Sequence, residues 1–230
     1  MQRDEVVHLQ IRTREISDPV SYILQAAIGR RVLNVGAGGG VERYLPEHRD
    51  LWLHARLRNV AAEVTGIDID HDSIEFASRH GVKIDYGDCE NVCFDHPFDL
   101  IVMSDVIEHV NAPLYAISNL ARQLSPQGRL LITTPNLTHY GMIGKAWFGK
   151  NTSVYYDHVM GFLPEHFQAI SNRLGLSLTD IAFFSHIDSR SMLNRYKSLL
   201  SRFIGKLIPR AHSSLLVILE SQERTCYPKP

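Results

Sequence analysis

Two features of this sequence, a glycine-rich turn and a later carboxylate, are well suited to hold a ligand. The apolar run 31–35 leads into alternating glycines, which lack the Cβ atoms that keep a ligand away from the backbone and which permit a tight turn into a helix. The apolar run 63–68 ends in Asp68, where a carboxylate can accept hydrogen bonds from both hydroxyls of a ribose. The pattern predicts a site for a nucleotide-like cofactor. The glycines are Gly36, Gly38 and Gly40.

The spacing of these residues disfavours two other classes of ligand. A dinucleotide fingerprint requires G-x-G-x-x-G, but counting from Gly36 puts Val41 at the sixth position. The alternation of Asp68, Asp70 and Asp72 is superficially like a calcium-binding EF-hand, yet the required glycine and glutamate are not at the sixth and twelfth loop positions. We assign no metal ligands from the sequence.

The order of apolar runs and helical patterns predicts the scaffold that positions these residues. Their alternation is typical of an α/β protein with a mostly parallel sheet and helices on both faces. Segment 135–162, rich in Gly, Tyr, His and Asn, is expected to be a long loop above the carboxyl ends of the strands, where ligands bind. Seven strands are expected near residues 31–35, 63–68, 82–86, 98–104, 128–134, 177–184 and 214–220, with helices over 20–28, 73–79, 112–124 and 164–174.

The composition restricts the number of domains, the kinds of partner and the cellular compartment that we expect for this chain. The chain has 230 residues, 44% of them hydrophobic, which is enough for one complete core and too few for two comfortable domains. A formal net charge of -1 shows no basic excess that would favour a nucleic-acid partner. Three cysteines without a paired-ligand spacing fit a reducing compartment, and the polar N-terminus lacks the apolar stretch of a signal peptide. We therefore expect a cytoplasmic protein.

The sequence resembles the class I S-adenosylmethionine-dependent methyltransferases over most of its length. Three segments carry the resemblance: N-x-G-x-G-x-G at 34–40, Y-G-D-C-E at 86–90 and D-V-I-E-H-V at 105–110. The last is similar to the E-H-V ending of a small-molecule branch that includes quinone- and sugar-modifying members. The resemblance implies a Rossmann-like fold with a seven-stranded sheet, S-adenosylmethionine as the cofactor and a small-molecule acceptor.

The resemblance also implies which residues contact the cofactor. Asp68 occupies the position of the family's ribose-binding carboxylate. Asp88 corresponds to the aspartate that accepts a hydrogen bond from the adenine amino group, and the backbone amide of Cys89 is available to an adenine ring nitrogen. Ser104 and Asp105 follow the fourth strand and are expected to line the pocket near the methyl group. The full set of expected cofactor contacts is Asn34, Gly36, Gly38, Gly40, Asp68, Ile69, Asp88, Cys89, Ser104 and Asp105.

One position departs from the family pattern. The family usually has Asp or Glu where this chain has Asn34, and that charge favours the positively charged amino group of the methionine moiety. Asn34 keeps a carbonyl acceptor but lacks the charge. The departure implies weaker cofactor binding, and in the extreme a non-catalytic partner subunit.

Methyl transfer from a sulfonium ion is an in-line displacement, so alignment of the acceptor about 3 to 3.5 Å from the methyl carbon can supply most of the catalysis. A hydroxyl acceptor also needs a base. His109, after the fourth strand, and His158, in a segment similar to the family's H-V-x-x-F, are the candidates. Because the chain has twelve histidines, a structural role is an open alternative for each, and Glu108 has the alternative of orienting the loop.

The segment 189–212 is unusual because it has six basic residues and no acidic one, with apolar residues at helical spacing. We expect an amphipathic helix that covers the sheet or the active site. The same pattern also fits an interfacial helix that meets anionic lipid or a lipid-linked substrate through 195–208.

The sequence thus predicts one methyltransferase domain over 1–230, with a flexible arm at 1–16, an amphipathic helical insertion at 185–213 and a tail at 223–230. The expected activity is transfer of a methyl group from S-adenosylmethionine to a small molecule, most readily to oxygen of a quinone-, sugar- or natural-product-like acceptor. The alternatives are the non-catalytic partner subunit and an NAD-linked or nucleotide-sugar Rossmann enzyme. The oligomeric state is not indicated.

Overall fold

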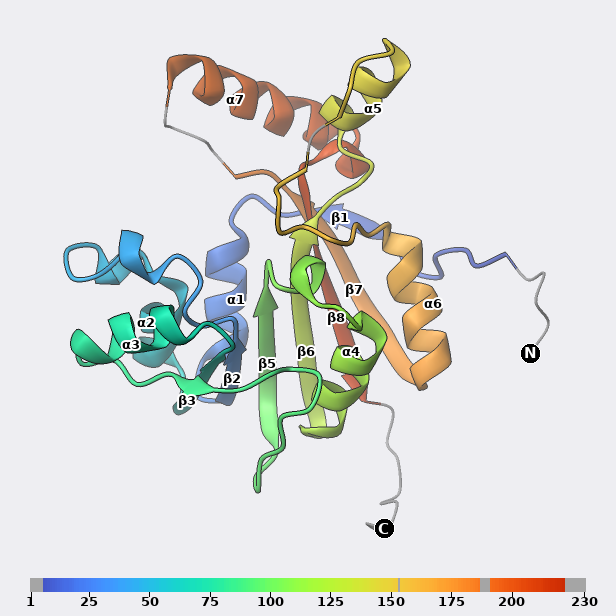
Figure 1. Cartoon of the computed structure of the whole chain (residues 1–230). Helices are drawn as coiled ribbons and strands as arrows, with labels where there is room; N and C mark the ends of the chain where they lie inside the picture. The colour runs from blue at the N-terminus through green and yellow to red at the C-terminus, as the bar shows by residue number, and fades with distance from the viewer. Residues whose placement is uncertain (1–5, 153, 187–190, 222–230) are drawn as a thin grey trace.

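The computed structural model describes residues 6–152, 154–186 and 191–221, in which eight strands form one sheet (Figure 1). The strands are β1 (Thr13–Glu15), β2 (Arg31–Val35), β3 (Glu63–Asp68), β4 (Asp85–Tyr86), β5 (Phe98–Ser104), β6 (Leu124–Pro135), β7 (Leu176–Phe184) and β8 (Ser214–Ser221). Their order in the sheet is β1-β7-β8-β6-β5-β2-β3-β4. Strand β8 is antiparallel to β6 and β7, and the other neighbours are parallel.

Helices cover both faces of this sheet. The α-helices of the described ranges are α1 (Pro19–Ala27), α2 (Leu53–Val60), α3 (His71–Arg79), α4 (Pro113–Arg122), α5 (Tyr140–Trp147), α6 (Pro164–Leu174) and α7 (Met192–Leu207). On one face, Ile23 of α1 and Leu57 of α2 pack in one apolar cluster. On the other face, Ile117 of α4 and Phe167 of α6 belong to a second cluster. Figure 1 shows α1 on one side of the sheet and α4 and α6 on the other.

The central strand β5 shows why its sequence is a continuous apolar run. Successive side chains of a strand point to opposite faces, so each face of a doubly covered sheet needs its own apolar residues. Leu100 and Val102 lie in the α1–α2 cluster, whereas Ile101 and Met103 lie in the α4–α6 cluster. All four side chains are fully buried, and the strand end is thereby fixed at the edge where a ligand would bind.

The predicted mostly parallel α/β fold is confirmed, with one strand more than expected. All seven expected strands are present, although the one expected at 82–86 is reduced to Asp85–Tyr86. The eighth, β1, lies within the segment 1–16 for which a flexible arm was predicted, and that prediction is wrong for Thr13–Glu15. These residues pair in parallel with β7, and Arg14 Nε donates to Asp180 Oδ1 at 3.1 Å.

One further segment differs from its prediction. The expected loop 135–162 contains α5, and its start is bound to the region after α7, since Asn136 Nδ2 donates to the carbonyl oxygens of Arg210 and His212 at 2.8 Å each. Helix α7 forms where the insertion 185–213 was predicted. The predicted tail 223–230 lies outside the described residues. Among the helices described, none combines the length and the apolar character needed to cross a bilayer.

Candidate active site

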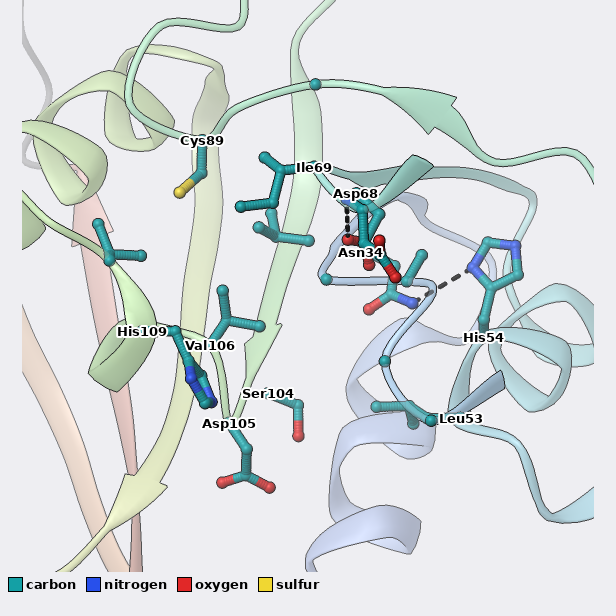
Figure 2. A pocket seen from close by; sticks show the side chains of 18 of the residues that line it. Asn34, Leu53, His54, Asp68, Ile69, Cys89, Ser104, Asp105, Val106 and His109 are labelled. Carbon is teal, nitrogen blue, oxygen red and sulfur yellow. Dashed lines mark hydrogen bonds between the residues drawn. The ribbon is translucent and has the colours of Figure 1, made fainter. Parts of the chain in front are cut away.

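A cavity of about 730 Å³ opens at the carboxyl ends of β2, β3 and β5 (Figure 2). Parallel strands present their carboxyl ends at one edge of a sheet, which is where open α/β sheets bind ligands. The sequence-predicted residues that line this cavity are Asn34, Gly36, Gly40, Asp68, Ile69, Asp88, Cys89, Ser104, Asp105 and His109. Gly38 and His158 are not among the lining residues, but each contacts a residue that is, Asp68 and His109 respectively.

The carboxylate of Asp68 is held by two backbone amides. Its Oδ2 accepts from Gly38 N at 2.7 Å, and its Oδ1 accepts from Asp70 N at 3.0 Å. A Cβ at position 38 would lie 2.9 Å from Asp68 Oδ2, so glycine is required for this approach. Because a carboxylate offers about four acceptor positions, two remain for hydroxyl donors from a ligand. Gly38 therefore orients Asp68 and does not itself face the cavity.

The start of the turn shows a second steric requirement. Gly36 has a φ of +71°, and a Cβ there would lie 2.4 Å from Cγ2 of Val106. The next amide, Ala37 N, donates to Ile67 O at 3.0 Å. The turn after β2 is thus packed against both β3 and the segment after β5, so it closes one wall of the cavity.

A buried histidine that sequence reasoning missed pairs with Asn34. His54 of α2 lines the cavity, and its Nδ1 lies 3.2 Å from Asn34 Nδ2. Burial, with a smaller contribution from Arg58, lowers the pKa of His54 to about 4, so the imidazole is neutral near pH 7. Because the Asn34 amide nitrogen can only donate, Nδ1 accepts and the Asn34 carbonyl oxygen is left for another donor. In Figure 2 that oxygen points away from His54.

The segment 87–90 forms another part of the cavity wall. Asp88 Oδ1 accepts from Glu90 N at 2.9 Å, which fixes the turn. Burial, assisted by Asp88 and Glu90, raises the pKa of the Cys89 thiol to about 12. The thiol is therefore protonated at neutral pH and unsuited to act as a nucleophile, in keeping with the role of a small apolar wall.

The end of β5 places two polar side chains beside the cavity in a constrained backbone. Asp105 has a φ of 52°, a left-handed conformation that is uncommon for a residue other than glycine. Thr133 of β6 holds it there, because Asp105 N donates to Thr133 O at 3.0 Å and Thr133 Oγ1 donates to Asp105 Oδ1 at 3.2 Å. Ser104 Oγ lies 2.9 Å from the same hydroxyl. Strain of this kind gathers at functional sites.

His109 faces the cavity from the segment after β5, and its ring nitrogens have different roles. Its Nδ1 lies 3.0 Å from the carbonyl oxygen of Asp157 and 3.4 Å from the carboxylate Oδ2 of the same residue. A carbonyl oxygen can only accept, so Nδ1 donates, and in the neutral form of the ring the lone pair is on Nε2. His158 packs edge-on against the His109 ring with centroids 4.7 Å apart, and burial lowers its pKa. His158 thus limits the orientations open to the His109 ring.

Glu108 is buried beneath these two histidines. Its Oε2 accepts from Thr134 Oγ1 at 3.0 Å, and within the described part of the chain its Oε1 has no hydrogen-bond partner. Burial raises the pKa of Glu108 to about 7. One carboxylate oxygen and one nitrogen from each of His109 and His158 lie within 4.8 Å of one another, so the three groups could ligate a divalent cation. This grouping was not predicted from the sequence.

The arrangement therefore has two chemical ends. Backbone-fixed carboxylates and the glycine turn form a polar end suited to hydroxyl, amino and ammonium groups. At the other end, His109 presents a basic nitrogen close to the strained end of β5. A cavity of about 730 Å³ has room for a nucleoside-sized ligand and a second small molecule.

Comparison with known proteins agrees with this geometry. Residues 8–181 match a family described as "Methyltransferase domain". A ubiquinone biosynthesis O-methyltransferase of Actinobacillus pleuropneumoniae serotype 5b is 32% identical over 134 residues, which are 52% of this chain and 53% of that protein. The protein of the same name from Xanthomonas euvesicatoria is 29% identical over 176 residues, 71% of this chain and 69% of that protein. The chain spans about half the length of the first of these relatives.

Solved structures of low sequence identity share the fold. Magnesium protoporphyrin IX methyltransferase of Synechocystis PCC 6803, with bound S-adenosylhomocysteine, has a TM-score of 0.59 at 16% identity and covers 88% of this chain and 80% of its own. The [4+2]-cyclase SpnF has a TM-score of 0.55 at 16% identity, covering 88% and 79%. Fold likeness alone therefore does not decide the reaction. The family match, however, spans well over half of the chain, and the protein belongs to the family of methyltransferase domains.

Proposed function

We propose that the protein is an S-adenosylmethionine-dependent methyltransferase that methylates a hydroxyl group of a small molecule. The observation that carries the proposal is the placement of His109, with a basic Nε2, in the same cavity as the backbone-fixed Asp68. The polar end would bind the cofactor, and His109 would receive the proton of the acceptor. The described chain would act as one methyltransferase domain.

The residues of the polar end fit this cofactor. Asp68 has acceptor positions left for the two ribose hydroxyls, and Asp88 with the Cys89 amide would contact the adenine. The free carbonyl oxygen of Asn34, held by the neutral His54, would accept from the ammonium of the methionine moiety. When bound, the cofactor supplies an electrophilic methyl group on a sulfonium. Ser104 and Asp105 would line the space in which that methyl group lies.

His109 would act as the general base. Nε2 of His109 would take the proton that the acceptor hydroxyl releases when its oxygen is methylated, and the carbonyl and carboxylate of Asp157 would stabilise the resulting imidazolium through Nδ1. General bases of this kind contribute about 10²- to 10⁴-fold in rate. Oxygen as the acceptor atom is supported by the name O-methyltransferase of the curated relatives.

Calorimetry and a transfer assay test the proposal. Purified protein should bind S-adenosylhomocysteine and not NAD, and should transfer label from S-adenosylmethionine to a member of a panel of small phenols and sugars. His109→Gln should keep the affinity for S-adenosylhomocysteine and lose about 10²-fold or more in transfer rate. Binding of NAD in preference to S-adenosylhomocysteine would overturn the proposal.

Removal of divalent cations by a chelator distinguishes two possible roles of His109, that of a general base and that of a metal ligand. If His109 is the base, removal of divalent cations should leave the transfer rate unchanged. Loss of transfer on chelation, restored by added metal, would instead assign Glu108, His109 and His158 to a cation site. Cofactor binding without transfer to any acceptor would favour the non-catalytic partner subunit.

A further inference from the structure

Helix α7 carries its apolar side chains outward. On one side of α7, large apolar residues recur at helical spacing and are exposed, for example Tyr196 at 66%, Phe203 at 63% and Leu207 at 72%. Among the side chains of α7 that the structure describes, those of the exposed stripe are Met192, Tyr196, Leu199, Leu200, Phe203 and Leu207. The expectation that this helix would cover the sheet or the active site with that stripe is therefore wrong.

The opposite side of α7 is small and polar, and it faces inward. Ser201 and Gly205 are buried there. Ser201 Oγ lies 2.9 Å from Ser185 Oγ, which in turn lies 2.9 Å from His212 Nδ1. A Cβ at position 205 would lie 2.2 Å from His212 Nε2, so the helix backbone lies directly against that ring. A helix that packs on a core normally does the reverse, with its apolar face inside. The side of α7 opposite the stripe is therefore packed closely against the rest of the protein, and the stripe itself faces outward.

Helix α5 extends the same exposed layer. Its end carries Trp147 and Phe148, which are 86% and 81% exposed. Figure 1 shows α5 and α7 together beyond the carboxyl ends of the strands, and Thr138 Oγ1 before α5 donates to the carbonyl of Arg210 after α7 at 2.8 Å. Exposed apolar side chains on two helices at the same end of the molecule indicate an interaction surface rather than isolated surface residues.

The charge of this layer indicates the kind of partner. Segment 189–212 has six basic residues and no acidic one, and the α5 helix with the residues up to 156 adds Lys145 and Lys150, again with no acid. Arg210 is neutralised by Glu165, at 2.6 Å, whereas Lys206 is exposed beside the stripe. An apolar stripe flanked by cations is complementary to anionic headgroups over an acyl region. Two copies of this surface would bring like charges together, so self-association is disfavoured.

The layer is also connected to the cavity. The segment that follows α5 returns to the site, where Val159 N and Met160 N donate to the backbone oxygen of Glu108 at 3.0 and 3.2 Å. The carbonyl of Asp157 in this segment holds His109. A bilayer against α5 and α7 would therefore lie on the side of the cavity that is walled by the His109 segment.

We propose that the exposed faces of α5 and α7 dock the protein peripherally on an anionic lipid bilayer. The docking brings the His109 side of the cavity to the lipid surface, where an apolar acceptor would be concentrated. Docking itself does not depend on the methyl-transfer reaction, so the two proposals can fail separately.

Co-sedimentation with vesicles tests the docking. The parent protein should sediment with vesicles of phosphatidylglycerol and phosphatidylcholine, should not sediment with phosphatidylcholine alone, and should be released as salt is raised. Phe203→Asp should weaken vesicle binding by about tenfold or more, and Lys206→Glu should weaken it to a smaller extent. The matched control is Tyr115→Asp, an exposed aromatic residue on α4, which should bind vesicles like the parent.

Thermal unfolding and gel filtration complete the test. Phe203→Asp should keep the parent melting temperature and elution volume, because its side chain is exposed. Failure of the parent to bind anionic vesicles would overturn the proposal. A concentration-dependent dimer that Phe203→Asp abolishes would also overturn it, since the stripe would then be an interface between two copies of the chain.

Discussion

The polar end of the cavity and the α5–α7 layer are both built beyond the carboxyl ends of the strands, but they use their side chains in opposite ways. At the polar end, charged and amide groups point inward and are fixed by backbone amides or by a buried partner, as with Asp68 and Asn34. In the α5–α7 layer, Ser201 and Gly205 lie inward and the apolar side chains lie outward. The first region is organised for a small polar ligand, and the second for an extended apolar surface.

This difference has an energetic meaning. Desolvated polar groups are costly unless they are hydrogen-bonded, so the polar end must be assembled before a ligand arrives. Exposed apolar side chains are unfavourable only while they are in contact with water. A partner surface that covers them provides the favourable free energy of burial. Substitutions in the two regions should therefore be measured by different quantities, ligand affinity in the first and surface binding in the second.

The largest expected effect is on the polar end. Asp68→Ala should weaken binding of S-adenosylhomocysteine by about 2 to 4 kcal/mol, because charge-assisted hydrogen bonds to both ribose hydroxyls are lost. Titration calorimetry measures this loss. Asp72→Ala, a nearby exposed carboxylate in the first turn of α3, is the control and should bind like the parent. Equal losses in the two folded variants would mean that the ribose site is misplaced.

The second effect is on stability at acid pH. The pKa of His54 is about 4 in the folded state against an ordinary value of 6.5, so the unfolded state binds more protons between these values. The free energy of unfolding should therefore fall as pH falls from about 6.5 to 4, by up to about 3 kcal/mol in total. His54→Gln should flatten this part of the pH profile in urea unfolding. The exposed control His48→Gln should keep the parent slope, and an unchanged slope in His54→Gln would contradict the neutral Asn34–His54 pair.

The third effect tests the inward side of α7. Gly205→Ala should reduce the free energy of unfolding by about 1 to 3 kcal/mol, because its Cβ would overlap the His212 ring and force the helix away. Gly144→Ala in α5 is the matched control, since an added Cβ there meets nothing within 4 Å. Denaturant unfolding compares the two. If Gly205→Ala is as stable as Gly144→Ala, the small face of α7 does not anchor the helix.

The smallest effect is on the outward side of the same helix. Phe203→Asp should change the free energy of unfolding by no more than about 0.5 kcal/mol, because the side chain is exposed and no core contact is removed. A loss of several kcal/mol in the same denaturant series would show that the stripe is buried in the protein's own core, and the contrast between the two regions would fail.

The sequence could predict which residues line the polar end of the cavity because these residues are positioned locally. Asn34, Asp68 and Ser104 each stand in or at the end of a buried strand, and parallel strands bring such positions to one edge. His54 could not be found in this way. It lies in a short helix without a recognisable motif, and its role depends on a buried contact with Asn34, 20 residues earlier.

Other parts of the fold depended on tertiary contacts that a sequence pattern does not report. Helical periodicity indicated that α7 has an apolar stripe but not which way the stripe faces, because that is decided by the packing of Gly205 against His212. Strand β1 has three residues, too few for an alternating pattern, and its pairing depends on the exposed edge of β7.

The short strand β1 has a consequence for the behaviour of the protein at high concentration. A free edge of a sheet presents unpaired backbone N–H and C=O groups, on which strands of other molecules can assemble. Strand β1 occupies the β7 edge, and the Ile16 amide after it adds a further bond to Phe183 O at 2.9 Å. Because β1 is brief and carries Arg14 and Glu15, it offers a poor template for the next strand. Strand β1 therefore makes this edge of the sheet a poor site for edge-to-edge aggregation.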